Sequence, residues 1–446
     1  MDMPVARQRF GDVDLRPHQV ENSRKLTKIL RDCRGALDSS DTGTGKTYTA
    51  LATARMLHKI PYIICPKAVI PAWREACELM GLKEAHVTNY EQIRTGKGPD
   101  YCRISNGQYQ RWQWKLPQER YLIIFDEVHK CRRHSLQSRV LKHATRQKYY
   151  TLLLSATPFT TPLDLRYIGH ALGIHNGNGF YGWVRQWGCY KGNWGWEFDG
   201  KPEHLERLRK YMSPRVVRTK REDIPNFPET TIQPTLYDFG AAFKKHERKY
   251  DKELQALEES RDMDNAAVRY QFYRMKVELL KIPYLVDHVK ELNLDGFKVV
   301  VFFSFLRSIE EFRHYYEEPV TIVSGVQKDD LSEFRKEGEG TCVALCQYAA
   351  GGAGISLHGP DPRIAILNPT PSALEYKQAL GRIHRMGGGE TVQKLIFAAG
   401  TIEEKVYNSV REKAAGIDVL NDGDLTYYGE IQDCEIKERM ENERTP

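Results

Sequence analysis

The chain has 446 residues and a net charge of +7, because 66 Lys and Arg side chains face 59 Asp and Glu. This length corresponds to about three domains, or to two large domains with an insert, and it excludes a single small module. A composition of 41% hydrophobic and 28% charged residues is typical of a soluble globular protein and excludes disorder throughout. The apolar runs are far shorter than the ~20 residues of a membrane helix, and the amino terminus has no apolar signal core, so neither membrane insertion nor secretion is expected.

Basic and acidic side chains are unevenly divided along the chain. Residues 1–225 carry 38 basic and 22 acidic side chains, a net +16, whereas residues 226–446 carry 28 and 37, a net −9. A basic half indicates a polyanionic partner such as nucleic acid, although phosphate-rich small ligands or solubility also explain it. The nine cysteines are scattered, and Cys342 and Cys346 lack the spacing of a zinc site, so free thiols in a reducing compartment are expected.

Short apolar runs alternate with amphipathic stretches in two parts of the chain, as in parallel sheets wrapped by helices. The candidate strands are 62–65, 121–125 and 151–154 in the first part, and 298–303, 320–323, 341–345 and 363–367 in the second. Between the two parts, a Gly- and Trp-rich stretch and a proline-punctuated run precede a long, highly charged helix over 241–292. We therefore expect two α/β domains, 1–225 and 293–417, with a helical connector over 226–292 and a loosely docked acidic tail over 418–446.

The first motif with clear chemistry is Ser-Asp-Thr-Gly-Thr-Gly-Lys-Thr at 40–47, directly before a good helix start. Its glycines let backbone amides turn towards phosphate oxygens, and the positive end of the helix dipole adds to the attraction. Lys46 is expected to reach the outer phosphates of a nucleotide, and the Thr47 hydroxyl to ligate magnesium. Ser40 replaces the first glycine of such loops, but the Gly-Lys-Thr core is intact. The predicted nucleotide-binding residues in this loop are Thr42, Gly43, Thr44, Gly45, Lys46 and Thr47.

The second motif is the apolar run 121–125 followed by Asp126, Glu127, Val128 and His129. A buried strand that ends in two carboxylates places one to hold magnesium through water and the other to orient or deprotonate an attacking water. We assign the first role to Asp126 and the second to Glu127. With the phosphate loop upstream, this pair predicts an ATP-hydrolysing enzyme that uses ATP and magnesium.

These motifs and others, in order from about residue 12 to 412, resemble the helicases and translocases of superfamily two, and within it the Swi/Snf-type double-strand DNA translocases. The further segments that carry the resemblance include Leu-Arg-Pro-His-Gln at 15–19, Leu-Ser-Ala-Thr-Pro-Phe at 154–159 and Gln-Ala-Leu-Gly-Arg-Ile-His-Arg at 378–385. The resemblance implies an α/β fold of two RecA-like P-loop domains, parallel sheets flanked by helices, with a helical and aromatic connector. It also implies a DNA-dependent ATPase, with an aromatic insert and a basic brace over about 176–225.

The resemblance also carries site residues over to matching positions of this chain. Gln19 is expected to read the adenine edge, and Gly354 and Gln378 to line the nucleotide. The implied nucleic-acid contacts are Lys67, Asn89, Ser304 and Gln347.

Arg382 and Arg385 have a role that follows from their chemistry. Hydrolysis builds charge on the transferred phosphoryl group, and a guanidinium from a second domain stabilises that charge only when the domains close. The two side chains are three residues apart and share one face if the segment is helical, so both are expected to point into the cleft. Closure on ATP binding and opening after hydrolysis make a two-stroke motor, provided that each domain grips the phosphate backbone separately.

Aromatic residues outside the motifs have two interpretations, stacking on unpaired bases or packing of irregular segments, and we favour packing. One group lies beside Arg185 and Lys191 and consists of Tyr181, Trp183, Trp187, Tyr190, Trp194 and Trp196. The other, Trp112 and Trp114, belongs to a polar insert before the acidic pair and could form a hairpin that contacts DNA.

We therefore predict an ATP-dependent double-stranded DNA translocase that remodels branched DNA, by fork regression, annealing or branch migration, or that displaces bound protein. Two alternatives stay open: a 3′-to-5′ strand-separating helicase, and a nucleotide-gated DNA-binding subunit that recruits a nuclease or a methyltransferase. The expected partners are duplex or branched DNA without sequence specificity, and single-strand-binding or recombination proteins; the chain is expected to be a monomer without a membrane partner. Compact microbial, viral and annealing helicases combine these motifs, so we expect a role in DNA repair, replication or recombination. The expected location is the cytoplasm of a prokaryotic or viral host cell, or the nucleus of a eukaryote.

Overall fold

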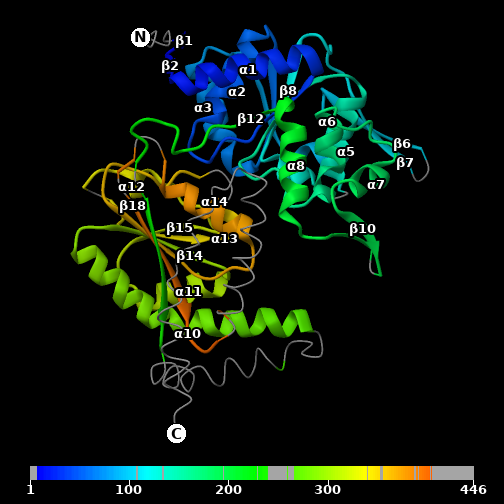
Figure 1. The fold of residues 1–446 in the computed structure, drawn as a ribbon. Coiled ribbons are helices and arrows are strands. Elements are labelled where there is room, and N and C mark those ends of the chain that lie inside the picture. The colour runs from blue at the N-terminus through cyan, green and yellow to red at the C-terminus, as the bar shows by residue number, and fades with distance from the viewer. Residues whose placement is uncertain are drawn as a thin grey trace.

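The computed structural model describes residues 8–106, 109–132, 135–193, 195–228, 230–239, 259, 266–338, 340–351, 355–385, 388–389, 391–401 and 403. Within these residues the chain forms two lobes, each built around a parallel sheet with helices packed against it (Figure 1). The expectation of two RecA-like α/β domains is confirmed. The predicted acidic tail, 418–446, lies outside the described residues.

The first sheet has six parallel strands in the order β12-β3-β9-β8-β4-β5. Each face of this sheet is covered by its own hydrophobic core. Ile123 of β8 packs in the core on one face, and the next residue, Ile124, packs in the core on the other. Strands buried on both faces read as continuous apolar runs, and for this reason the sequence located β4, β8 and β9. The strands are β3 (Gly35–Asp38), β4 (Ile60–Cys65), β5 (His86–Asn89), β8 (Tyr121–Asp126), β9 (Tyr150–Leu154) and β12 (Val216–Val217).

Helices cover both faces of the first sheet. One core contains Leu26 of α1, Leu51 of α2 and Trp73 of α3. The other contains residues of α4, α5, α6 and α8, such as Leu141 and Ile168. The helices are α1 (Pro17–Cys33), α2 (Lys46–Met56), α3 (Ile70–Leu79), α4 (Tyr90–Arg94), α5 (Leu136–Arg146), α6 (Leu165–Ala171), α7 (Phe180–Arg185) and α8 (Pro202–Met212).

Three antiparallel hairpins decorate this lobe: β1 (Gln8–Phe10) with β2 (Val13–Leu15), β6 (Tyr101–Asn106) with β7 (Tyr109–Trp114), and β10 (Cys189–Gly192) with β11 (Gly195–Phe198). Trp112 and Trp114 of β7 are buried, and Trp112 Nε1 donates a hydrogen bond to the Ile93 carbonyl at 3.1 Å. The favoured packing of these two rings is therefore observed, and the expected hairpin is formed; a contact of this hairpin with DNA stays a prediction. In the aromatic insert Trp187 is buried, whereas Tyr181 and Tyr190 are exposed; Trp194 lies outside the described residues.

The second sheet also has six parallel strands, in the order β13-β18-β17-β14-β16-β15. Val299 and Val300 of β14 pack in separate hydrophobic cores on the two faces of this sheet. The strands are β13 (Thr230–Tyr237), β14 (Lys298–Phe303), β15 (Val320–Val323), β16 (Val343–Gln347), β17 (Arg363–Leu367) and β18 (Thr391–Ala398). The helices are α10 (Ala266–Leu294), α11 (Leu306–Tyr315), α12 (Ser332–Arg335), α13 (Tyr348–Gly351) and α14 (Ala373–Ile383).

The predicted connector, 226–292, differs from the observed arrangement. Strand β13 lies inside this range but pairs along its whole length with β18, as the edge strand of the second sheet. Helix α10 places Leu285 and Val289 in the core beneath that sheet. Both elements are therefore layers of the second lobe, and the chain passes between the sheets over 218–229. Among the described residues, no helix combines the length and the apolar character needed to cross a membrane.

Candidate active site

The phosphate loop follows β3 and ends at Gly45, one residue before α2. Gly43 and Gly45 both have a φ of +86°, a region that residues with a side chain rarely adopt. A Cβ on Gly45 would also collide with Gln19 Nε2. These two glycines therefore let the loop turn its amides inward while it packs against α1.

Lys46, at the start of α2, folds back over the loop. Its ammonium donates hydrogen bonds to the carbonyl oxygens of Ser40 at 2.7 Å and Asp41 at 2.9 Å. Burial lowers the pKa of Lys46, and the carboxylates of Asp38, Glu127, Asp41 and Asp126 oppose this effect. The lysine is thus aimed at the place where phosphates are predicted to bind, within reach of the acidic pair.

Asp38 is a charged neighbour of Lys46 that the sequence analysis missed. It ends β3, has no exposed surface, and its Oδ1 accepts a hydrogen bond from the Ser40 amide at 2.9 Å. Burial raises the pKa of Asp38, although the positive charge of Lys46 counteracts the effect. An aspartate at the end of a short strand carries no motif of its own, so only its position next to Lys46 reveals it.

Gln19 joins the first helix to the same loop. Its side-chain Oε1 accepts from the Arg16 amide at 2.9 Å, and its Nε2 donates to the Gly45 carbonyl at 3.3 Å. The neighbouring His18 Nε2 lies 2.9 Å from the Thr44 carbonyl. The predicted adenine-reading residue therefore lies beside the phosphate loop; its role in reading the base stays a prediction.

Asp126 and Glu127 lie at the carboxyl end of β8, at the same edge of the sheet as the phosphate loop. Trp73 Nε1 donates to Asp126 Oδ2 at 2.8 Å, and Glu127 adopts a left-handed φ of +54°. Such a backbone conformation costs a non-glycine residue energy and often marks a functional site. His129 Nδ1 lies 3.2 Å from Glu127 Oε2 and 3.3 Å from the Ser155 hydroxyl, which links the pair to the Ser-Ala-Thr segment.

The two carboxylates have opposite electrostatic environments. Burial raises the pKa of Asp126, with the charge of Glu127 as the next cause. Burial acts on Glu127 in the same sense, but the hydrogen bond from His129 and the charges of His129 and Arg382 outweigh it and lower the pKa of that carboxyl. Glu127 is therefore the carboxylate that stays ionised, as an acceptor of a proton or hydrogen bond from water must be.

The second lobe reaches this pair through α14. Arg382 is buried, and its Nη2 lies 3.9 Å from Glu127 Oε1. Gln378 Nε2 lies 3.4 Å from His129 Nε2. The protonated Nδ1 of His129 faces Glu127, and its other ring nitrogen faces the Gln378 side-chain amide. The acidic pair of the first lobe and the end of α14 in the second therefore lie next to each other.

Arg385 does not share the contact that Arg382 makes with Glu127. Helix α14 ends at Ile383, so the expected common helical face of the two arginines is not formed. Arg385 Nε donates to the Gly381 carbonyl at 3.1 Å and its Nη2 to the Ile355 carbonyl at 3.1 Å, both in its own lobe. A Cβ placed on Gly43 would nonetheless lie 3.2 Å from Arg385 Cγ, so this arginine borders the phosphate loop.

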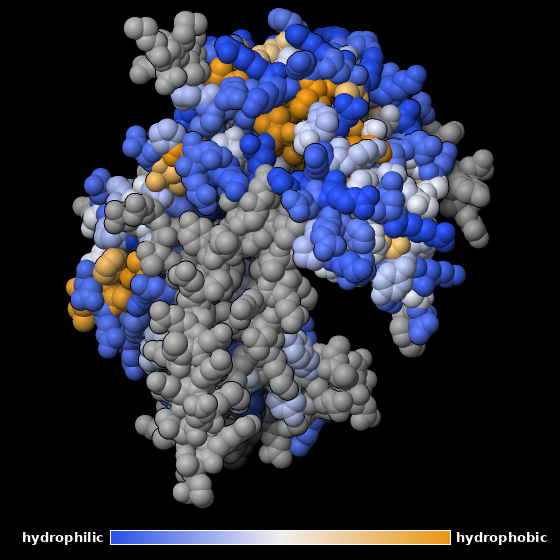
Figure 2. Space-filling model, in the orientation of Figure 1, coloured by the Kyte–Doolittle hydropathy of each residue, from blue (hydrophilic) through white to orange (hydrophobic). Residues whose placement is uncertain are grey.

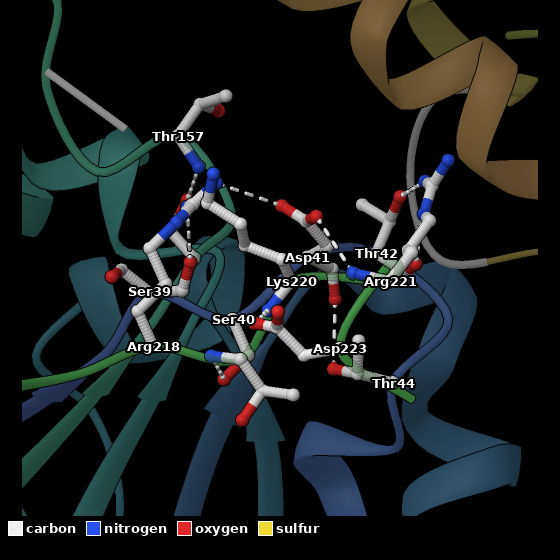
Figure 3. Close-up of polar contacts among 12 residues, drawn as sticks. Ser39, Ser40, Asp41, Thr42, Thr44, Thr157, Arg218, Lys220, Arg221 and Asp223 are labelled. Carbon is white, nitrogen blue, oxygen red and sulfur yellow. Dashed lines mark hydrogen bonds and ion pairs between the residues drawn. The ribbon is translucent and has the colours of Figure 1, made fainter. Parts of the chain in front are cut away.

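A segment after β12 holds the outside of the phosphate loop (Figure 3). Asp41 lies between two of its arginines: Arg218 Nη2 donates to Asp41 Oδ1 at 3.1 Å, and the Arg221 amide donates to Asp41 Oδ2 at 3.2 Å. Arg221 Nε also donates to the Thr42 carbonyl at 3.0 Å, and its Nη2 donates to the Thr42 hydroxyl. A basic brace was expected over this stretch, but its hydrogen bonds to the phosphate loop were not.

Magnesium is the cofactor that the donor set at this site fits. Thr47 and Asp126 supply oxygen atoms, which Mg²⁺ prefers, and a cation would stabilise the ionised form of the carboxyl whose pKa burial has raised. The described residues contain no cluster of three or more His, Cys, Asp or Glu that could cage a metal.

The residues expected to contact nucleic acid have diverse surroundings. Lys67 is exposed at the start of a short 3-10 helix. Asn89 is nearly buried and caps α4, since its Oδ1 accepts from the Gln92 amide at 2.7 Å. Ser304 is held by Arg274 and the Pro369 carbonyl, and Gln347 accepts from the Gly325 amide. The side chain of Lys67 is thus accessible to a ligand, whereas the described contacts of the other three residues serve local structure. Gly354, which was expected to line the nucleotide, lies outside the described residues.

Comparisons with known proteins show similarity to a restriction-enzyme subunit and to helicases. A family profile described as "Type III restriction enzyme, res subunit" matches residues 12–160, which hold the phosphate loop and the acidic pair. A putative ATP-dependent RNA helicase of Acanthamoeba polyphaga mimivirus is 28% identical, over 92% of this chain and 84% of its own length. The chromodomain-helicase-DNA-binding protein 1-like of Danio rerio is 22% identical over 95% of this chain, which spans 45% of that relative's length.

Among solved structures, the SWI2/SNF2 ATPase core of Sulfolobus solfataricus in complex with dsDNA has 15% identity, 98% coverage of both chains and a TM-score of 0.40. The acidic pair and the end of α14 meet where the two lobes join, and relatives that match nearly the whole chain are described as helicases. The chain is therefore similar to ATP-dependent helicases, and it is an ATP-hydrolysing enzyme.

Proposed function

We propose that the chain is an ATP-dependent translocase on double-stranded DNA, which remodels branched DNA or displaces bound protein. One observation carries the proposal: the second lobe contacts both the acidic pair and the phosphate loop of the first. Arg382 approaches Glu127, and His384 Nδ1 lies 3.0 Å from Arg221 Nη1, on the segment that grips the loop. A change at the nucleotide therefore alters contacts between the lobes, as a motor requires.

The same contacts suggest how the stroke works. Lys46 is bound to carbonyl oxygens of its own loop, and Arg382 has Glu127 as its anionic partner. The phosphates of ATP are stronger acceptors for both cations, so bound ATP would compete with these protein partners for Lys46 and Arg382. The contact between the lobes would then depend on whether the phosphates are bound.

Magnesium is part of the proposal, with Thr47 and Asp126 as its protein ligands. When bound, it neutralises charge on the β- and γ-phosphates. Trp73 fixes the carboxylate of Asp126 by its hydrogen bond, and Glu127, held ionised by His129 and Arg382, accepts a hydrogen bond from the attacking water.

The decisive measurement is the ATPase rate of the full chain with single strands, linear duplexes, forks and four-way junctions. We expect duplex and branched DNA to stimulate turnover, with displacement of a triplex strand ahead of the motor. A rate that no nucleic acid changes would refute the proposal. Unwinding of a forked duplex without triplex displacement would replace it by the strand-separating helicase.

RNA is the second candidate track, because the mimivirus relative is described as a putative RNA helicase. The same panel with RNA duplexes decides between the two: stimulation by RNA alone would move the activity to RNA. Stoichiometric retention of ATP with negligible turnover would instead favour the nucleotide-gated binding subunit.

A further inference from the structure

A row of cations lies on α5 and α6, outside every predicted motif. Arg139, Lys142 and Arg146 are three and four residues apart along α5, so they share one face of the helix. Arg166 adds a fourth cation from α6, which packs against α5 in the same core. Helix α5 contains no acidic residue, and within the described part of the chain none of these four side chains forms an ion pair.

The positive charges of these side chains interact with one another, and not with a carboxylate. Partial burial lowers the pKa of Lys142, followed by the charges of Arg146, Arg166 and Arg139. The one carboxylate between residues 136 and 171, Asp164, is engaged by Arg132 at 3.5 Å. Unpaired like charges on one face repel each other, and a bound polyanion removes that cost because it supplies the missing counter-charge.

Aromatic rings continue the cationic row towards the β10–β11 hairpin. Arg166 lies 5.4 Å from the ring centre of Tyr181, which is 40% exposed and stacks on Trp196 at 4.8 Å. Arg185 lies 5.6 Å from the ring centre of Trp196. We name this surface the α5–α7 strip; it consists of Arg139, Lys142, Arg146, Arg166, Tyr181, Arg185 and Trp196.

The α5–α7 strip lies on a different side of the first lobe from α3 and the residues that precede it. Helices α5, α6 and α7 and strand β10 lie on the side of the first lobe away from α1 and α3 (Figure 1). In the view of Figure 2, the outer part of that lobe has a mainly hydrophilic surface. Lys67 belongs to the short 3-10 helix directly before α3, so it lies on the other side of the lobe from these helices, and two arms of a branched DNA could occupy the two sides at once.

We propose that the α5–α7 strip is a second nucleic-acid surface, which binds the phosphate backbone of one arm of a branched DNA while the motor engages another. This rests on the proposed function, since it presupposes a motor on DNA. Cations spaced along a helix face suit successive phosphates, and contacts of that kind read no sequence. The rings of Tyr181 and Trp196 offer apolar surface to sugars or frayed bases between the cations at either end.

The test compares two full-chain variants that each lose three charges. The strip variant is R139Q/K142Q/R146Q, and the control is R24Q/K25Q/K28Q, whose three side chains are exposed on α1. Binding of a labelled four-way junction and of a short linear duplex is measured over a salt series. For the strip variant we expect about tenfold weaker junction binding and a salt slope reduced by about 2 to 3, since each phosphate contact contributes ~0.9. Junction binding by the control variant should stay within about twofold of wild type. The duplex-stimulated ATPase rates of both variants should do the same.

A second strip variant, R146Q/R185Q, changes only exposed side chains. It distinguishes a loss of binding from a folding defect of the triple variant. Unchanged junction binding in both strip variants, with normal duplex-stimulated ATPase, overturns the strip but leaves the proposed function standing. Equal losses of binding to the duplex and to the junction would place these residues on the motor's own track and overturn the proposal. A labelled RNA hairpin and an acidic peptide are measured beside them, and a loss confined to either one would assign another partner and also overturn the proposal. A wild-type chain indifferent to all DNA overturns both proposals.

Discussion

Arg221 and His384 join the two lobes by a hydrogen bond of 3.0 Å between Nη1 and Nδ1. His384 Nε2 lies 2.6 Å from the Pro228 carbonyl, so Nε2 carries the proton and Nδ1 accepts from the guanidinium. Because Arg221 also holds Thr42, the phosphate loop and the end of α14 share one arginine. The segment between the sheets is therefore a mechanical link as well as a connection.

Replacing Arg221 tests this link. We expect Arg221→Ala to lower kcat for ATP hydrolysis by about tenfold or more and to change KM for ATP much less, because Arg218 still holds Asp41. Arg221→Lys should restore little, since an ammonium cannot reproduce the forked contacts of a guanidinium. Steady-state kinetics decide, with Lys210→Ala on the exposed face of α8 as the control. A KM effect alone would contradict the link.

His384 makes stability depend on pH. Burial, followed by the charge of Arg221, lowers the pKa of His384 to about 4 from an ordinary value of 6.5. The unfolded chain therefore binds the proton more readily, so this contribution to stability is complete above about pH 6.5 and is lost as the pH falls towards 4. His384→Gln should show a smaller loss of stability than wild type between pH 7 and pH 5. Urea unfolding over that range measures it, with His314→Gln as the control.

Gly381 of α14 lies directly against Thr42 of the phosphate loop in the other lobe. A Cβ at this position would collide with the Thr42 hydroxyl and lie 3.0 Å from Arg221 Nη2. Gly381→Ala should therefore force the lobes apart and lower ATP turnover by about tenfold, while thermal unfolding changes by only a few degrees. Gly182→Ala is the matched control, because nothing lies within 4 Å of a Cβ there. Equal activity of the two variants would show that turnover does not need this contact.

The charged groups of the nucleotide site should separate binding from turnover. We expect Lys46→Ala and Glu127→Gln to reduce ATP hydrolysis by at least about 100-fold, because each removes a group in contact with the reacting phosphate or water. Glu127→Gln should still bind ATP, as nucleotide retention on a filter can show. Wild-type turnover in either variant would mean that the site is misplaced.

The two arginines of the second lobe should differ. Arg382 approaches Glu127 directly, whereas Arg385 is bonded to the Gly381 and Ile355 carbonyls. Arg385→Ala should spare ATP binding and lower turnover, while Arg382→Ala should additionally raise the pKa of Glu127 and shift the acid limb of the pH–rate profile upward. Identical pH–rate profiles for the two variants would contradict the separate roles.

Much of the fold was predictable because buried parallel strands leave a local signal. The predicted ranges 298–303, 320–323 and 363–367 coincide with β14, β15 and β17 residue for residue. Strands without that signal were missed: β3 contains a glycine and an aspartate, and β18 carries Gln393 and Lys394. The edge strand β13 was read as part of a connector, since its pairing partner lies far along the chain.

The sequence by itself determined the chemistry of the protein: a phosphate loop, an acidic pair and two arginines in a fixed order, each readable because spacing and residue type are local properties. Only the tertiary structure decided which of these groups meet. It assigned Arg382 but not Arg385 to Glu127, paired Asp41 with Arg218 and Arg221, and buried Trp112. Such pairings depend on strand order and on how two lobes pack, so they join residues more than 150 positions apart, which no local pattern encodes.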